Sequence, residues 1–334
     1  MVFGLGFELS LILGALALIL LVYGSEEVVD RLTGIAEYYG IPDILIAMTV
    51  ISVGTSLPEL AAHTIGSIGI LRGTLNYQIG SATVLGANIG SDVVQQTLVV
   101  GVVVFFFAWK KGGKFEFTDR FLKKDYSAMI GTTLMTLVLA WDGVLSRLDG
   151  LILMGSFFGY IYYLYHTRHE RLNHSVEASD SIQRDMVIFT VSFVTILISA
   201  HVVLEVTETV VQTTGLGGSI IGVMTLGLAA ALPEMFTAIQ GIRQKASGIS
   251  LGTLIGSNIT NPLLGIGFGS LLSTYWVPRP LVLWDLPMET FTAGMLLLYL
   301  LFVSDRKLGW KGGIYLIGLY VFYVVIRFAF FAAD

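Results

Sequence analysis

The chain has 334 residues, of which 54% are hydrophobic and only 13% are charged, and it contains no cysteine. Soluble domains carry about 25% charged residues, so this composition indicates an integral membrane protein without a large soluble domain. The missing cysteines exclude disulfides, thiolate metal sites and a cysteine nucleophile. A net charge of −5 without a dense basic cluster gives no reason to expect nucleic acid as a partner.

Apolar stretches in chain order predict an all-α polytopic membrane protein with about ten transmembrane helices, since each crossing needs roughly 20 mostly apolar residues. The first stretch lacks the basic start of a cleavable signal and is interpreted as a span. A charged segment divides five spans from five, which predicts a first repeat at 1–166, a linker at 167–185 and a second repeat at 186–334. The predicted spans are 8–24, 41–70, 77–109, 126–143, 147–166, 186–212, 218–242, 248–274, 285–303 and 312–331.

The distribution of basic residues predicts the orientation. With the N-terminus outside, the inner loops hold 15 of the 19 lysine and arginine residues. Because basic loops stay on the cytoplasmic side, we expect a multi-pass protein of the plasma membrane with both termini outside and the central loop in the cytoplasm. The lysine-rich loop 110–124 is expected to contact anionic headgroups of the bilayer.

Two pairs of similar segments indicate an internal repeat. Leu57-Pro58-Glu59 aligns with Leu232-Pro233-Glu234 at an offset of 175, and 86–91 aligns with 252–257 at an offset of 166. The difference places nine extra residues in the first copy, around 68–78. Because each half has an odd number of spans, the second copy is predicted to be inverted relative to the first.

The two glutamates of the repeat, Glu59 and Glu234, are the leading candidates for a functional site. Each follows a proline within a long apolar run, and an ionisable group at membrane depth is costly unless it meets a cation, a proton or a polar cavity. The proline removes a backbone donor and predicts a broken helix with free carbonyls. Inversion would bring both carboxylates into one site, where hard oxygen ligands suit calcium or sodium.

The glycine-serine blocks supply further polar groups. Ser91 and Ser257 end these blocks, and Gln95 and Asn261 follow four residues later, on the same helix face. Their amide oxygens can either ligate a cation or make interhelical hydrogen bonds. The glycines that precede the serines at i and i+4 predict a face that another helix can approach closely.

Two other polar residues near these blocks are interpreted as structural. Asp92 follows Ser91 in the sequence, so it points about 100° away from it on a helix, which favours interhelical pairing over ligation. His63 comes one turn after Glu59 and is interpreted as a packing residue.

At these residues the sequence resembles the cation/calcium exchanger superfamily, specifically the sodium/calcium exchanger branch of prokaryotic type. The two inverted repeats of that family carry Gly-Thr-Ser-Leu-Pro-Glu and Gly-x-x-Ile-Gly-Ser blocks, and residues 54–59 match the first block completely. The resemblance implies that the first span of each repeat moves as a sliding gate. It also implies a set of calcium and sodium ligands: Glu59, Glu234, Thr55, Ser56, Ser91, Ser257, and backbone carbonyls near Ser52 and Gly227.

The second repeat departs from the family pattern. Residues 229–234 read Ala-Ala-Ala-Leu-Pro-Glu, so both hydroxyl side chains of the block are missing, and Gln95 and Asn261 stand where relatives often have asparagine and aspartate. Two ionised glutamates balance one calcium or two sodium ions, whereas three sodium ions would leave excess positive charge in a low-dielectric site. Fewer sodium ions, or proton coupling through one glutamate, therefore remain open.

These features predict a secondary active antiporter that exchanges Ca²⁺, or a related cation, for Na⁺ by alternating access. The alternatives are a proton-coupled cation antiporter and, less favoured, a passive cation channel. An enzyme is not expected, because the sequence has no His-Glu-x-x-His motif and no cysteine. We expect the ions to be transported rather than held as cofactors, and we expect no obligate protein partner.

Overall fold

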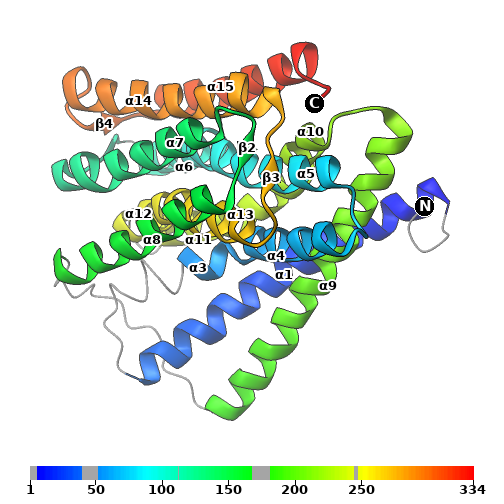
Figure 1. The fold of residues 1–334 in the computed structure, drawn as a ribbon. Coiled ribbons are helices and arrows are strands. Elements are labelled where there is room, and N and C mark those ends of the chain that lie inside the picture. The colour runs from blue at the N-terminus through cyan, green and yellow to red at the C-terminus, as the bar shows by residue number, and fades with distance from the viewer. Residues whose placement is uncertain (1–5, 40–51, 112, 168–180, 244–246) are drawn as a thin grey trace.

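The computed structural model of the chain describes residues 6–39, 52–111, 113–167, 181–243 and 247–334. Most of these residues are helical, and short antiparallel strands connect some of the loops (Figure 1). The predicted all-helical membrane architecture is therefore confirmed at this level. Within the described ranges, six helical stretches are long and apolar enough to cross a membrane.

The elements are given in chain order, with η denoting a π-helical segment. The first half comprises α1 (Phe7–Tyr38), α3 (Ser52–Thr55), α4 (Leu57–Arg72), α5 (Tyr77–Val94), η3 (Gln95–Val99), α6 (Val100–Lys111), β1 (Phe115–Glu116), η4 (Phe121–Tyr126), α7 (Ser127–Ala140), β2 (Val144–Leu145) and α8 (Arg147–Thr167). The second half comprises α9 (Ile182–Thr214), α10 (Gly218–Gly222), η5 (Val223–Gly227), α11 (Leu228–Arg243), α12 (Ser247–Thr260), η6 (Asn261–Ile266), α13 (Gly267–Ser273), β3 (Tyr275–Trp276), η7 (Leu281–Asp285), α14 (Leu286–Phe302), β4 (Lys307–Leu308) and α15 (Trp310–Phe330).

Several helix boundaries differ from those predicted. Helix α1 continues to Tyr38, past the predicted end at residue 24, and Arg31 pairs with Glu27 one turn earlier, which satisfies charged groups on the extension. The first part of the predicted span 41–70 lies outside the described residues. The stretch 68–78 forms the end of α4, a turn at Gly73 with φ of 70° and the start of α5, so it lengthens the hairpin between these helices.

Both strand ladders join the two halves of the chain. Strand β1 pairs antiparallel with β4, with Phe115 opposite Leu308, and β2 pairs antiparallel with β3, with Val144 opposite Trp276. The two ladders lie toward opposite ends of the helical bundle (Figure 1). Each half thus contributes one strand to each ladder.

Helix α5 and the segment α10–η5 are in backbone contact, and most of the residues that face each other there are buried. A Cβ atom added to Gly90 would lie 2.7 Å from Val223 Cα, and one added to Gly227 would lie 2.8 Å from the carbonyl oxygen of Ala87. Only glycine permits such an approach without displacement of the partner backbone. The small-residue face predicted for the first glycine-serine block is confirmed, and it brings the two halves together beside the candidate ligands.

Helices α1 and α9 pack along each other and form one flank of the molecule. They are tilted relative to the other long helices, and their lower ends extend away from the bundle (Figure 1). Many of their large apolar side chains are exposed, Ile19 and Val187 among them, as expected for a lipid-facing surface.

Candidate functional site

The first candidate glutamate lies at a true helix break. Helix α3 ends at Thr55, Ser56 interrupts it, and α4 begins at Leu57 with Pro58 in its first turn, where the missing N–H of proline is tolerated. This arrangement places Glu59 in the first turn of α4, with only 2% of its surface exposed. The break predicted here from the sequence is confirmed.

The second candidate glutamate is positioned differently. Glu234 is fully buried, but Pro233 lies inside the continuous helix α11. The break predicted at Pro233 is therefore wrong, and the irregularity comes earlier, in the π-helical segment η5 that ends at Gly227. There Gly222 and Gly227 let the backbone press against α5, which favours a local change of helical pitch over a break.

The hydroxyl and amide groups predicted as ligands gather around the two glutamates from both halves. Thr55 Oγ1 lies 3.0 Å from Ser257 Oγ, and both hydroxyls lie beside the Glu234 carboxylate. Ser91 lies beside the Glu59 carboxylate, and Asn261 Nδ2 lies 3.5 Å from Glu59 Oε1. Each carboxylate is thus approached by polar groups of the first half and of the second.

Several buried oxygens in this site have no hydrogen-bond partner among the described residues. They are Glu59 Oε2, both carboxylate oxygens of Glu234, Ser56 Oγ and Asn261 Oδ1. Buried oxygens without partners are costly and uncommon in folded proteins. Such a set of carboxylate, hydroxyl and amide oxygens is what Ca²⁺ or Na⁺ takes as ligands.

The structure separates the two candidate amides. Gln95 donates from Nε2 to Ser91 Oγ at 3.1 Å and accepts at Oε1 from Asn258 Nδ2 at 2.8 Å. Its oxygen is therefore engaged in a protein hydrogen bond, whereas the Asn261 oxygen is free among the described groups. The geometry favours Asn261 as a ligand and Gln95 as a residue that positions Ser91.

Two backbone positions complete the set implied by the resemblance. Ser52 begins α3, and its side chain lies outside the described part of the structure. Gly227 ends η5, where an added Cβ would lie 2.9 Å from the backbone nitrogen of Ser91. Gly227 and Ser91 are therefore neighbours, although they are far apart in the sequence.

Asp92 adds a third carboxylate to the site. Asn261 Nδ2 donates to Asp92 Oδ1 at 2.7 Å, which confirms the predicted interhelical pairing. The same nitrogen of Asn261 lies near Glu59, so the Asn261 side chain connects Asp92 to Glu59. The sequence predicts an interhelical pairing for Asp92 but does not identify Asn261 as its partner.

Glu289 in α14 is a fourth buried acid, which the sequence analysis missed. Its Oε1 accepts from Thr133 Oγ1 at 2.7 Å and from Gln96 Nε2 at 2.9 Å. Gln96 Nε2 also donates to Asn258 Oδ1 at 2.8 Å, and Asn258 contacts Gln95. A chain of amides thus joins Glu289 to the candidate site, and the signal for it was an acid inside the predicted span 285–303.

His63 belongs to a neighbouring packing network, as predicted. Its Nε2 lies 3.1 Å from Asn88 Nδ2 and its Nδ1 lies 3.0 Å from the Tyr275 hydroxyl, which contacts Ser67 Oγ at 2.8 Å. Asn88 Nδ2 also donates to the backbone carbonyl of Asn261 at 2.9 Å. Both ring nitrogens of His63 are occupied, and the network fixes the backbone beside the site.

The site has an excess of acid. Within the described ranges, no lysine or arginine forms an ion pair with Glu59, Glu234, Asp92 or Glu289, whereas the buried Asp285 pairs with Arg327 at 3.0 Å. Buried charges require compensation, and among the described residues no basic side chain supplies it to these four acids. The described residues contain no cluster of three His, Cys, Asp or Glu side chains suited to hold a metal.

Comparison with known proteins places the chain among exchangers. Residues 9–166 and 185–329 match the family model described as sodium/calcium exchanger protein. The inner membrane protein YrbG of Escherichia coli is 27% identical over 77% of this chain and 78% of its own length. The sodium/calcium exchanger MaX1 of Methanosarcina acetivorans is 24% identical over 94% of this chain and 97% of its own.

Solved structures share the fold. The sodium-calcium exchanger NCX_Mj superposes with a TM-score of 0.64 at 21% identity, covering 96% of this chain and 99% of its own. The H⁺/Ca²⁺ exchanger CAX superposes with a TM-score of 0.74 at 18% identity, covering 96% of this chain and 82% of its own. At these identities the likeness supports the fold, while the activity must be argued from the residues of the site.

Proposed function

Because the chain belongs to the sodium/calcium exchanger protein family, we propose that it is a secondary active antiporter that exchanges Ca²⁺, or a related cation, for Na⁺ by alternating access. The observation that carries this proposal is the set of buried oxygens on Glu59, Glu234, Ser56 and Asn261 that have no hydrogen-bond partner in the described part of the chain. Ca²⁺ and Na⁺ are the transported ions in this proposal, not cofactors.

Counter-transport follows from a shared site. A calcium ion and a full set of sodium ions would use the same carboxylates of Glu59 and Glu234, so they cannot be bound together without a large excess of positive charge. The empty site, with buried unpaired carboxylates, is costly. The protein would therefore change between its inward-open and outward-open states only with either calcium or sodium bound.

The carboxylate of Asp92 changes the number of cations whose charge the site can balance. With Asp92 included, three ionised acids would balance three sodium ions, or one calcium ion and one proton, so the reduced sodium number suggested by the two glutamates alone is not required. Proton coupling is the second candidate, because the four buried acids have no ion-paired base within the described residues. A sodium gradient and a pH gradient applied separately distinguish the two.

We further propose that 1–166 and 186–334 are inverted repeats joined by a linker at 167–185. The two halves follow one order of elements: a long helix, a helix that is broken in the first half and contains a π-helical segment in the second, a helix with a π-helical segment, a strand, a π-helical segment leading into a helix, a strand and a final helix. The strand that follows the third helix of each half pairs with the second strand of the other, as a two-fold relationship requires. Helices α1 and α9, packed on each other at one flank, would form the sliding gate.

The proposed location is the plasma membrane with both termini outside. The start of α1 and the end of α15 lie at one end of the bundle, and the end of α8 lies at the other (Figure 1). The basic residue Lys307 belongs to the β1–β4 ladder, toward the latter end, and Arg306 directly precedes it. A reporter fused after Asp334 should be accessible only from outside; a cytoplasmic reporter would reverse the orientation.

The exchange proposal is tested by calcium-45 uptake into proteoliposomes. Uptake should require internal sodium, and Glu59→Gln or Glu234→Gln should reduce it to background, whereas Glu116→Gln, which removes a surface partner of Lys307, should leave it unchanged. Uptake driven by a pH gradient in sodium-free buffer would favour the proton-coupled antiporter. Uptake without any counter-ion gradient would favour a channel, and retained exchange in both glutamine variants would contradict the site.

A further inference from the structure

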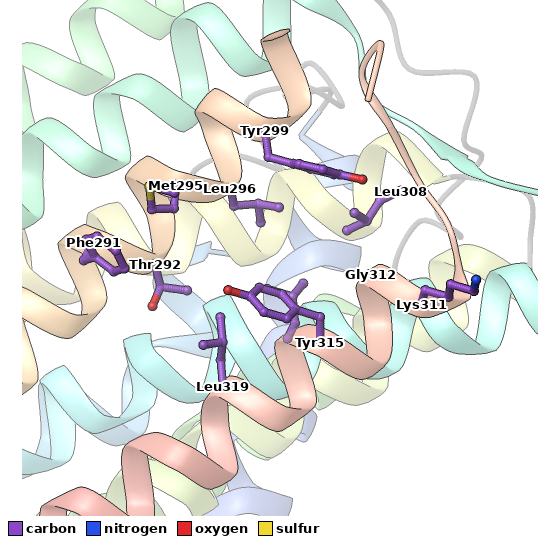
Figure 2. A pocket seen from close by; sticks show the side chains of 11 residues that line it. Phe291, Thr292, Met295, Leu296, Tyr299, Leu308, Lys311, Gly312, Tyr315 and Leu319 are labelled. Carbon is purple, nitrogen blue, oxygen red and sulfur yellow. The ribbon is translucent and has the colours of Figure 1, made fainter. Parts of the chain in front are cut away.

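A groove separate from the ion site lies between helices α14 and α15. Its cavity volume is about 360 Å³, within the roughly 300–1,000 Å³ typical of small-molecule sites. Met295 and Leu296 line it from α14, and Tyr315 and Leu319 line it from α15 (Figure 2). Met295 and Tyr315 are at least half exposed, so the groove opens on the surface that faces lipid.

The groove matches the depth of one membrane leaflet. From Lys311 to Leu319 it follows more than two turns of α15, a length of roughly 12 Å at 1.5 Å per residue. The hydrocarbon core of a bilayer is about 30 Å thick, so one leaflet contributes about 15 Å. A single acyl chain entering from the membrane edge could therefore run along the groove.

One end of the groove carries uncompensated positive charge. Lys311 lines this end and lies 5.6 Å from the ring centroid of Trp310, but it forms no ion pair within the described part of the chain. The side chain of Lys114 comes within 3.7 Å of the position that a Cβ of Gly309 would occupy, also at the start of α15. Lys307, by contrast, pairs with Glu116 at 2.9 Å, and this hydrogen bond raises the pKa of Lys307.

From the outer end of the groove inward, a charged group, a hydroxyl group and an apolar lining follow one another, in the same order as the headgroup, esters and acyl chains of a phospholipid. Figure 2 shows Lys311 at the outer end with its ammonium directed away from the apolar lining, and it shows the Tyr299 hydroxyl directed toward Leu308 at the same end. Tyrosine is common at the level of the headgroups and esters, where its ring is apolar and its hydroxyl can donate. Beyond Tyr299 the lining is mainly apolar.

We propose that this groove binds one anionic phospholipid, with its phosphate at Lys311, its ester region near the Tyr299 hydroxyl and one acyl chain between α14 and α15. The charge at the mouth selects an anionic headgroup over a zwitterionic one, and the apolar wall selects a lipid over a soluble phosphate. The site is independent of the proposed exchange, because Glu59 and Glu234 do not line it.

Native mass spectrometry of the intact chain in detergent, titrated with phosphatidylglycerol or phosphatidylcholine, tests this assignment. Phosphatidylglycerol should bind about fivefold more tightly, the factor that corresponds to roughly 1 kcal/mol for one basic residue near an anionic headgroup. Lys311→Gln should abolish the preference, whereas Arg72→Gln, at an exposed basic residue at the end of α4, should preserve it. A preference that survives Lys311→Gln overturns the proposal.

A second variant tests the acyl-chain position. Met295→Trp should fill the groove and abolish binding of both lipids, whereas Leu151→Trp, on an exposed position of α8, should not. Thermal melting of each variant separates loss of binding from loss of folding, and if Met295→Trp melts early, Leu319→Phe serves in its place. Unchanged lipid binding in a folded groove variant, or a dimer that only the groove variants disrupt, contradicts the proposal and favours a second copy of the chain as occupant.

Discussion

Asn261 and Asp92 form a hydrogen bond across the two halves of the chain, with 2.7 Å between Asn261 Nδ2 and Asp92 Oδ1. The bond holds the Asn261 amide so that its nitrogen faces the acids and its oxygen is left without a described partner. In the proposed ion site, Asp92 would therefore contribute negative charge and would orient the Asn261 amide.

Asp92→Asn should keep the protein folded but weaken cation binding by about tenfold or more, since a charge-assisted hydrogen bond contributes roughly 1.5–3 kcal/mol. Calcium-45 uptake measured over a range of calcium concentrations reports the change in half-saturation. Asp305→Asn, at an 81% exposed side chain, is the control for loss of one negative charge. Equal half-saturation in Asp92→Asn and the wild type would show that Asp92 plays no part in the site.

Glu289 should support the amides behind the ion site. Glu289→Leu removes the acceptor for Thr133 and Gln96, and leaving buried donors with fewer partners should cost about 1–3 kcal/mol of unfolding free energy. Glu289→Gln keeps a side-chain carbonyl acceptor and should lose less. Melting temperatures in detergent compare the variants, and equal destabilisation by leucine and glutamine would contradict the hydrogen-bonding role.

The buried pair of Arg327 and Asp285 fixes α15 against η7. Arg327 is fully buried, donates to Asp285 Oδ2 at 3.0 Å and also hydrogen-bonds Ser219 at the start of α10. Arg327→Met should destabilise the fold by about 3–5 kcal/mol, because it leaves a buried carboxylate without its base. The double variant with Asp285→Leu should recover much of that loss in thermal melting; a double variant less stable than Arg327→Met alone would argue against this explanation.

Disulfide trapping tests the sliding gate. Because the sequence contains no native cysteine, only the introduced pair can form a disulfide within the chain. A Cβ on Gly54 would lie 3.7 Å from Val29 Cβ, and one on Gly14 would lie 3.4 Å from Val206 Cβ, both near the distance a disulfide requires. Oxidation of Val29→Cys/Gly54→Cys ties α1 to α3 and should stop exchange until a reductant is added. Oxidation of Gly14→Cys/Val206→Cys ties α1 to α9, which would move together, and should leave exchange intact.

The opposite pattern of inhibition would place the moving boundary between α1 and α9. Exchange that persists after complete oxidation of both pairs would contradict a sliding motion of this flank. The reduced form of each variant controls for the substitutions themselves.

The sequence predicted the parts of the fold and site that have local signals. Apolar run length located most helices, and the repeated Leu-Pro-Glu block identified Glu59 and Glu234, whose side chains are buried as expected. The spacing of Ser91 and Gln95 predicted a shared helix face, which their hydrogen bond confirms. These features depend on helical periodicity and on the cost of charge in an apolar setting, both of which the sequence records directly.

The remaining features depend on contacts between distant segments. Glu289 meets Gln96 and Thr133 only because α14 packs beside α7 and η3. An analysis based on a period of 3.6 residues does not detect π-helical segments. The irregularity at η5 was therefore not predicted, and a break was predicted at Pro233 instead. Asn258 is adjacent to Ser257 in the sequence, but its hydrogen bonds to Gln95 and Gln96 could be identified only from the fold.

The pairing of β1 with β4 and of β2 with β3 also bears on how such a chain could have evolved. Strands β1 and β2 belong to the first half and never pair with each other; each is completed by a strand of the second. A protein consisting of one half alone would have two open strand edges, and it could close both only against another copy in the reverse orientation. If the halves are inverted repeats, as proposed, an ancestor of half this length would have needed to enter the membrane in both directions, and gene fusion would then have fixed one copy in each.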